Sequence, residues 1–354
     1  MRILLVAPQS PDTILGTIGR YCKNELKNLG HDLEVFDFRQ SRYLKSSAGT
    51  FIKKYLKKFI PAPTRQIPFV NSLEKEKMNE RLLIAAERNK PDILFVLMGE
   101  TIFPETLEKL KKSGIATVNW FHDSVLAPIR EYFVREYAGY YDYFFMIDSE
   151  DILKHIRVNA RVVKTIPLAC EPIVHKTMLL TDEESKTYGS EVGFVGTVKF
   201  RRTDVLERVS DFDLGIWGYW LEKIPELKKH YRQQHIFGAE AAKIYNASKI
   251  ILDIHLSYGS GNKQFNVTPR VFEVPASGGF LLVNENPMLN DLYEIGQEII
   301  CYKDESELEE LIKYYLKHPE ERELIAKAGQ NKAHNEHTYK KRLEEIISII
   351  YKNG

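Results

Sequence analysis

Cysteine is scarce in this chain, with three residues among 354. Cys22, Cys170 and Cys301 are odd in number and far apart, which argues against a disulfide framework and a cysteine-based metal site. The same usage favours a reducing compartment. A dominant charge is also missing, because 50 basic and 49 acidic side chains leave a formal charge of +1. No overall field therefore selects nucleic acid as a partner, and we expect none.

Long hydrophobic runs are lacking as well. No stretch approaches the length of a membrane span. The opening residues, MRILLVAP, form too short an apolar run for a signal peptide and fit a buried first strand. We therefore expect a cytoplasmic protein that is peripheral to a membrane at most.

What the chain does contain is an alternation of strand and helix signals. A length of 354 residues, with 44% hydrophobic and 28% charged side chains, suits two globular domains. In the first half, apolar runs rich in β-branched residues predict strands at Ile3–Ala7, Leu33–Phe38, Ile93–Met98, Ala116–Phe121, Tyr143–Ile147 and Arg161–Ile166. Segments of helical period lie between them at Ile18–Leu29, Glu74–Arg88 and Pro104–Lys112.

The pattern restarts after a polar stretch without clear period. Further strands are predicted at Val192–Val195, Leu214–Trp217, Ile250–His255, Phe280–Val283 and Ile299–Tyr302. The tail predicts helices at Glu305–Lys317, Pro319–Asn331 and Tyr339–Ile350. This alternation indicates two α/β, Rossmann-like domains facing each other across a cleft. We expect an N-terminal domain at 1–170, a linker at 171–190, a C-terminal domain at 191–336 and a final helix at 337–354.

A predicted helix start in the second domain is the most informative segment. Thr268 before Pro269 predicts an N-terminal cap with proline at the first helical position. Free amide groups at such an end bind anions, and Arg270 in the first turn can add a grip on phosphate oxygens. Glu273 lies on the same face and can accept both hydroxyls of a ribose. Asn266, just before this start, is included in the predicted site. The alternative is a plain capped helix with an Arg–Glu surface pair.

A glycine turn after the strand Val192–Val195 carries a second set of candidates. Gly196 and Thr197 allow a ligand to approach the backbone because glycine has no side chain. Lys199 and Arg202 follow at the start of a helix and can balance a diphosphate where no metal does so. The alternative is a strand, turn and helix with a solvated basic face.

The next strand ends in a second glycine with aromatic neighbours. Gly218, Tyr219 and Trp220 can edge or stack on a nucleobase. A tryptophan in a strand is more often part of the core, and that alternative stays open here.

In the first domain, His122 and Asp123 end a strand that faces the predicted cleft. Either side chain can remove a proton from an acceptor hydroxyl or bind a sugar hydroxyl. The alternative is a polar pair that caps the next helix. Gly16 follows the first strand and can admit a phosphate near the backbone, but the G-x-G-x-x-G spacing of a dinucleotide site is missing. Asp37 alone favours a dinucleotide.

No metal site is predicted. The acidic run Asp148–Asp151 stands at a strand end before Ile152, which favours a helix start over a metal-binding motif. Clustered histidines or cysteines that would bind zinc are absent from the sequence.

The segment from Arg39 to Arg65 is strongly basic. It carries eight basic residues and no acidic ones. Residues 50–60 place aromatic and aliphatic side chains on one helical face and lysines on the other, which suits an anionic membrane surface or an anionic acceptor. The alternative is a helix packed on the domain with a solvated lysine face.

Taken in order along the chain, these segments resemble the CgeB-like (spore maturation protein) family. The resemblance covers nearly the whole chain and is strongest from Gly193 to Tyr339. The residues that carry it are Pro91–Leu94, Val118–Asp123, Tyr141–Tyr143, Phe194–Thr197, Ile216–Gly218 with Trp220, Ile244–Ile250, Arg270–Gly278, Tyr314–Arg322, Ala326–Gly329 and His337–Tyr339.

Members of that family resemble glycosyltransferases of the two-domain GT-B type. The resemblance implies a UDP- or dTDP-sugar donor in the C-terminal domain, with Glu273 on its ribose and no further cofactor. It also implies that the last helix braces the first domain. We expect the acceptor to be a glycan, protein or lipid, which the sequence does not identify further. Many retaining GT-B enzymes have an acidic residue eight positions before this glutamate, whereas this chain has Phe265, so the stereochemical outcome stays open.

Other classes remain alternatives. A sugar-nucleotide epimerase of the same architecture would turn over its donor without an acceptor. A non-catalytic nucleotide-sugar-binding or coat-associated protein would bind without turnover. A nicotinamide oxidoreductase is the least favoured.

Overall fold

The computed structural model describes residues 1–38, 68–125, 128–154, 157–199, 201–219, 225–233, 236–255 and 266–353. The predicted membrane-contacting residues 50–60 and the predicted base-edging residue Trp220 lie outside these ranges. In the described part of the chain, no helix is long and apolar enough to cross a bilayer.

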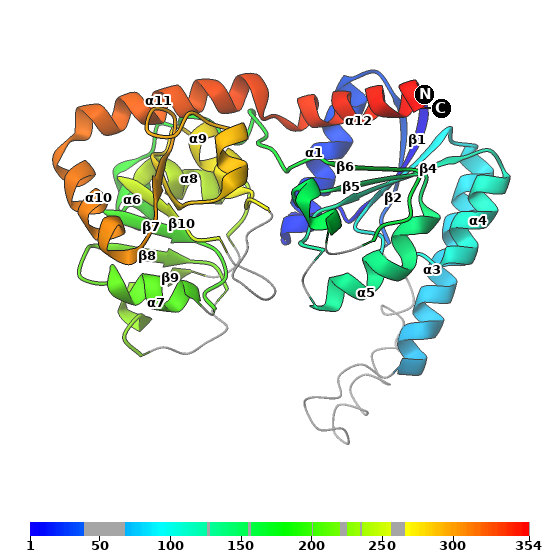
Figure 1. Cartoon of the computed structure of the whole chain (residues 1–354), viewed down its shortest axis with the longest axis horizontal. Helices are drawn as coiled ribbons and strands as arrows, with labels where there is room; N and C mark the ends of the chain where they lie inside the picture. The colour runs from blue at the N-terminus through cyan, green and yellow to red at the C-terminus, as the bar shows by residue number, and fades with distance from the viewer. Residues whose placement is uncertain are drawn as a thin grey trace.

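The first lobe is built on a parallel six-stranded sheet of order β2-β1-β3-β4-β5-β6 (Figure 1). Its strands are β1 (Arg2–Val6), β2 (Asp32–Phe36), β3 (Ile93–Leu97), β4 (Ala116–Phe121), β5 (Tyr143–Met146) and β6 (Val162–Thr165). Strands β3 and β5, which both lie inside the sheet, are buried throughout, as expected for a parallel sheet covered on both faces.

Helices cover both faces of this sheet. Helix α1 (Ile14–Asn28) packs on one face, and α3 (Pro68–Asn89), α4 (Pro104–Lys112) and α5 (Pro128–Tyr137) pack on the other. Thr13 caps α1 by accepting a hydrogen bond from the Gly16 amide at 3.1 Å. The capped start of α1 therefore lies at the carboxyl end of β1, where ligands of such sheets bind.

The second lobe repeats the design with the order β12-β11-β10-β7-β8-β9. Its strands are β7 (Val192–Val195), β8 (Leu214–Trp217), β9 (Tyr231–Gln233), β10 (Ile250–Asp253), β11 (Leu281–Asn284) and β12 (Ile300–Tyr302). Its helices are α6 (Asp182–Tyr188), α7 (Arg201–Arg208), α8 (Ala239–Ala247), α9 (Arg270–Ala276), α10 (Glu305–Lys317) and α11 (Pro319–Glu336). Short 3-10 helices lie at Ala138–Tyr140, Glu150–Lys154, Lys228–His230 and Pro287–Asp291.

The segment predicted as a linker, 171–190, contains a helix. Thr181 accepts a hydrogen bond from the Glu184 amide, and the Glu184 side chain accepts one from the Thr181 amide. This reciprocal capping box starts α6, which packs against α8. No helix was predicted in this part of the expected linker. The domain boundaries themselves stay a prediction.

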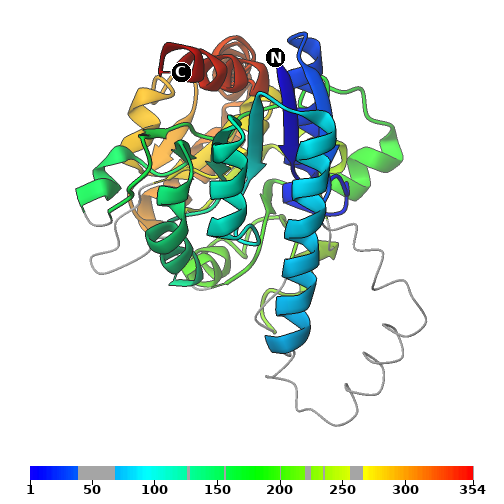
Figure 2. The ribbon, with the colours of Figure 1, turned by 90° about the vertical axis from the view of Figure 1, so that its right-hand side faces the viewer.

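Two passages of the chain meet between the lobes. Cys170 and Thr338 pair as an isolated parallel bridge, with hydrogen bonds from the Cys170 amide to His337 and from the Tyr339 amide to Cys170. Beyond this crossing, α12 (Tyr339–Asn353) lies along α1 on the first lobe (Figure 1). Both ends of the chain consequently lie on the same side of that lobe, as Figures 1 and 2 show.

Candidate functional site

A cavity of about 590 Å³ lies between the two lobes. The start of α1 and the end of β4 line one wall, and the ends of β7 and β8 with the start of α9 line the other. Parallel sheets bind ligands at the carboxyl ends of their strands, and this cavity lies at those ends in both lobes. We call it the cleft.

Most of the predicted site residues line the cleft. They are His122, Asp123, Gly196, Thr197, Arg202, Gly218, Tyr219, Asn266, Thr268, Arg270 and Glu273. Two predicted residues do not line it. Lys199 lies outside the cleft, and Gly16 packs against the loop before α1, because a Cβ atom there would stand 1.9 Å from the Ser10 carbonyl oxygen. The missing side chain of Gly16 thus serves packing rather than phosphate access.

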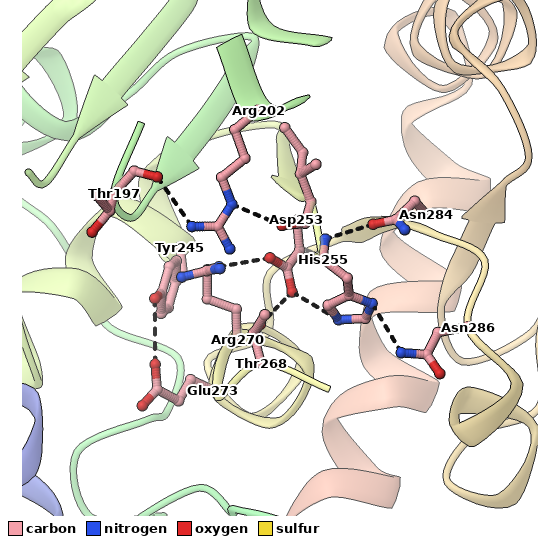
Figure 3. A network of polar contacts seen from close by, with 11 residues as sticks. Thr197, Arg202, Tyr245, Asp253, His255, Thr268, Arg270, Glu273, Asn284 and Asn286 are labelled. Atoms are coloured by element: carbon pink, nitrogen blue, oxygen red, sulfur yellow. Dashed lines mark hydrogen bonds and ion pairs between the residues drawn. The ribbon is translucent and has the colours of Figure 1, made fainter. Parts of the chain in front are cut away.

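A buried carboxylate at the end of β10 organises the second wall (Figure 3). Asp253 is 0% exposed and accepts a hydrogen bond from Arg270 Nε at 2.8 Å. The Thr268 hydroxyl also donates to Asp253, and His255 Nε2 lies 3.5 Å from the same carboxylate. Burial opposes ionisation and is the largest single effect. The nearby positive charges, chiefly that of Arg270, and the hydrogen bond from Thr268 together outweigh it and lower the Asp253 pKa to about 2. Sequence reasoning missed this residue.

The start of α9 differs from the prediction. The Thr268 hydroxyl donates to Asp253, and Pro269, which the structure places at the cap position, offers no side-chain hydrogen bond. The amides of Val271, Phe272 and Glu273 already donate to backbone carbonyls of residues 268 and 269. The helix is also only seven residues long. The predicted anion site made of free helix amides is therefore not formed, and positive charge at this wall comes from arginine side chains.

Two guanidinium groups stand over the Phe194 ring. Their carbon atoms lie 5.8 Å (Arg270) and 5.7 Å (Arg202) from its centroid. Gly196 makes room for this arrangement, because a Cβ atom there would stand 3.0 Å from Arg270 Nη1. Arg202 also donates to the Thr197 carbonyl at 3.0 Å and the Ile254 carbonyl at 2.9 Å. The glycine turn thus packs directly on the arginines that line the cleft.

Glu273 extends from α9 into the cleft with 17% of its side chain exposed. Its Oε2 accepts a hydrogen bond from the Tyr245 hydroxyl at 3.4 Å (Figure 3). Burial raises the Glu273 pKa to about 7, against the opposing charge of Arg270. This carboxyl group therefore changes its protonation state near neutral pH.

His122 lines the cleft from the first lobe, opposite the wall that carries Glu273. Its ring stands edge-on to Trp120 with centroids 4.5 Å apart, and neither ring nitrogen has a hydrogen-bond partner among the described residues. Burial lowers the His122 pKa to about 3, so the ring is neutral at ordinary pH. A neutral ring with two open nitrogens can donate one hydrogen bond and accept another.

Asp123 is already engaged. Its carboxylate accepts from Arg130 Nε at 3.0 Å and from the Ser124 amide at 2.9 Å. Arg130 also pairs with Glu100. Arg130 belongs to α5, so Asp123 bonds the next helix, as the alternative of a polar pair at that place describes. Its side chain also lines the cleft.

Asp148 connects the lobes, a role that sequence reasoning missed. It accepts hydrogen bonds from the Ser124 hydroxyl at 3.0 Å, the Val125 amide at 2.9 Å and Asn266 Nδ2 at 2.8 Å. Burial raises its pKa to about 6 despite these donors. The acidic run does start a short 3-10 helix, at Glu150. Within the described ranges, no group of three or more His, Cys, Asp or Glu side chains is arranged to hold a metal ion.

Residues 201–348 match the model of a family described as Glycosyl transferase-like. This match includes α9 and both of its cleft residues, Arg270 and Glu273. No curated protein matches the chain significantly.

Solved structures resemble the whole chain. Sucrose-phosphate synthase (tll1590) from Thermosynechococcus elongatus has a TM-score of 0.66 and 10% identity over 99% of this chain and 98% of that one. Anabaena Alr3699/HepE in complex with UDP-glucose has a TM-score of 0.65 and 11% identity over 99% and 100%. An alpha-glucosyltransferase in complex with UDP and a 13-mer DNA has a TM-score of 0.61 and 14% identity over 99% and 100%. The predicted GT-B fold is confirmed.

Proposed function

We propose that this protein is a GT-B glycosyltransferase that moves a sugar from a nucleoside-diphosphate donor, UDP- or dTDP-linked, to a glycan, protein or lipid acceptor. The observation that carries the proposal is the pair Glu273 and Arg270 on one face of α9 in the cleft between the lobes. The family match over residues 201–348 and the structural neighbour bound to UDP-glucose support it.

In this proposal the second wall binds the nucleotide. Glu273 accepts both ribose hydroxyls of a UDP-linked donor, or the single 3′-hydroxyl of a dTDP-linked one, and Gly218 and Tyr219 border the base. Arg270, Arg202 and the backbone at 196–197 face the diphosphate. Transfer forms a bond between the sugar's anomeric carbon and the acceptor oxygen and breaks the bond from that carbon to the diphosphate oxygen, so that the nucleoside diphosphate leaves. Fixed cations stabilise the charge that develops on the leaving oxygen. The guanidinium groups supply this charge without a metal ion.

His122 binds a hydroxyl group of the sugar or the acceptor. A ring with a pKa of about 3 is a poor base for a hydroxyl proton, so hydrogen bonding suits it better than proton removal. Asp123, held by Arg130, is the carboxylate beside it that can receive the proton of the attacking hydroxyl.

The assignment to the CgeB-like type, with no cofactor beyond the donor, follows the sequence resemblance. The proposed cytoplasmic location follows from the cysteine usage and the lack of long hydrophobic runs, and the proposed peripheral membrane contact from residues 50–60 of the basic segment. The expectation that nucleic acid is not a partner rests on the balanced charge of the chain.

A thermal-shift panel of UDP, dTDP, GDP, ADP and their glucose conjugates tests the nucleotide site. We expect selective stabilisation by one base, lost in Glu273→Ala and kept in Glu310→Ala, which changes an exposed glutamate on α10 far from the cleft. Equal shifts in the wild type and Glu273→Ala would place the nucleotide elsewhere.

Turnover separates transfer from the alternatives. The stabilising donor is incubated with water as the only acceptor, and release of the nucleoside diphosphate and free sugar is followed. Slow release supports a transferase. An altered sugar still linked to the nucleotide would identify an epimerase. Binding without turnover, both here and in further assays with glycan, protein and lipid acceptors, would identify a binding protein.

A further inference from the structure

A buried imidazole faces the cleft carboxylate from the segment between the lobes. The His175 side chain is 0% exposed, and its Nε2 has no hydrogen-bond partner within the described ranges. The facing acceptor is Glu273 Oε1, 3.9 Å away. A buried ring nitrogen without a hydrogen-bond partner lowers the stability of the folded protein, and most buried polar groups have a partner.

The hydrogen bonding of the other ring nitrogen fixes where the proton lies. His175 Nδ1 accepts the Glu171 amide at 3.0 Å, so Nδ1 carries a lone pair. Burial lowers the His175 pKa to about 3, and the ring is neutral. A neutral ring with a lone pair on Nδ1 carries its hydrogen on Nε2. His175 therefore points an N–H group, without a charge, toward Glu273.

Contacts from both lobes hold His175 in place. His334 on α11 donates through Nε2 to the His175 carbonyl at 3.0 Å. The ring stands edge-on to Tyr21 of α1, with centroids 5.9 Å apart. The turn Glu171–His175 follows Cys170, which pairs with Thr338 where the chain crosses between the lobes. The position of the N–H group is thus set by the junction of the lobes rather than by α9.

We propose that His175 is a positioning residue that orients the Glu273 carboxylate toward the ribose of the donor. The inference rests on the proposed nucleotide function of Glu273. A carboxylate has about four acceptor positions on its two oxygens. Tyr245 occupies one on Oε2, and His175 faces Oε1, which leaves acceptor positions for the two ribose hydroxyls.

The gap of 3.9 Å is longer than a hydrogen bond, which joins nitrogen and oxygen at about 2.7–3.2 Å. A shift of less than about 1 Å by the Glu273 side chain or by the lobes closes it. Ligand binding and this hydrogen bond therefore strengthen each other, because both require the same carboxylate orientation.

Two substitutions test the roles of the two ring nitrogens of His175 separately. His175→Asn places an amide oxygen near the Nδ1 position and can keep the bond to the Glu171 amide, but it does not reach Glu273. His175→Gln extends further and places an amide N–H near the Nε2 position. The readout is the ratio of affinities for UDP and 2′,3′-dideoxy-UDP, measured by calorimetry on the full chain. A purely structural change alters both affinities together and leaves this ratio unchanged.

We expect the wild type to prefer UDP by about tenfold or more, as for hydrogen bonds to a charged group. His175→Asn reduces the preference to that of Glu273→Gln, while His175→Gln retains most of it. An unchanged preference for UDP over 2′,3′-dideoxy-UDP in His175→Asn overturns the inference on His175 but not the proposed function. If His175→Asn does not fold, loss of the preference in folded His175→Gln overturns it. Failure of the wild type to bind any nucleoside diphosphate overturns the proposed function, and the inference with it.

Discussion

At the scale of single residues, the proposed ribose contact is tied to pH. The Glu273 pKa is raised to about 7 by burial, so the carboxyl is mostly protonated at pH 6 and mostly ionised at pH 8. Only the ionised form offers every oxygen position to ribose hydroxyls. We expect UDP-glucose affinity to rise about tenfold from pH 6 to pH 8, the ratio of ionised fractions for such a pKa.

Calorimetry with UDP-glucose measures this dependence cleanly, because its diphosphate is esterified at both ends and does not titrate near neutral pH. In Glu273→Gln the affinity should be low and nearly independent of pH. If the affinity of Glu273→Gln for UDP-glucose rose with pH as steeply as that of the wild type, the titrating group would be another residue.

His122 allows a second prediction at this scale. Its pKa of about 3 means that the ring keeps one protonation state from pH 5 to pH 9. His122→Ala should lower kcat for UDP-glucose hydrolysis about tenfold, the size of a lost neutral hydrogen bond, by the same factor at every pH in this range. Initial rates at several pH values test this. A ratio of wild-type to variant rates that rises through a titration would instead make His122 a general base.

The sequence predicted some of these residues and missed others for a physical reason. Glu273, Arg270 and His122 stand at a helix start or a strand end, where local patterns point to ligands. His175 and Asp253 have roles that depend on contacts with distant segments. An aspartate that closes an apolar strand of a parallel sheet lies on the ligand edge, and that signal could have found Asp253.

At the scale of elements, Asp253 ties the end of β10 to the start of α9 through Arg270, whose side chain is only 12% exposed. Asp253→Asn leaves that guanidinium buried without its counter-charge. We expect the free energy of unfolding to fall by about 3–5 kcal/mol, measured by denaturant unfolding. Asp213→Asn is the matched control, because this carboxylate is 59% exposed and pairs with Arg232 at 3.6 Å. Its loss should cost less than about 1 kcal/mol.

The pH dependence of the same pair has a definite sign. The Asp253 pKa is lowered from 3.8 to about 2, so the folded state favours the ionised form. The resulting stability is present above pH 3.8 and is lost as the pH falls toward 2. The difference between wild type and Asp253→Asn should therefore shrink in that window. A constant difference would show that the charge pair does not cause it.

Element boundaries were predictable where caps or long apolar runs mark them. Helices α4 and α10 have the predicted bounds, because Pro104 starts the first and Asp304 caps the second. Strand β9 was missed because it is a three-residue edge strand with two exposed positions, which gives almost no hydrophobic signal. Helix α6 was missed because none of its residues is buried, which leaves no hydrophobic pattern. Only the spacing of Thr181 and Glu184, typical of a capping box, indicates its start.

At the scale of the whole molecule, sequence periodicity predicted two α/β lobes but could not predict which side chains meet between them. Asp148 and Asn266 are 118 positions apart and meet across the cleft. Asn266 is tied in turn to Asn286, which donates to its carbonyl at 2.7 Å. Such a contact depends on how the two folded lobes pack against each other, and no local sequence pattern predicts it.

This contact joins the two lobes, so we expect it to favour the arrangement that they have in this structure, which we call closed. Asn266→Ala removes a hydrogen bond to the Asp148 carboxyl, worth about 1.5–3 kcal/mol if that group is charged. A smaller closed population lowers apparent ligand affinity in proportion. We expect a larger radius of gyration by X-ray scattering without ligand, and UDP affinity reduced about tenfold or more. Ser124→Ala is the matched control, since it removes a 3.0 Å hydrogen bond to the same carboxylate within one lobe. An equal change in both variants would show that Asp148 stabilises its own lobe and does not hold the cleft closed.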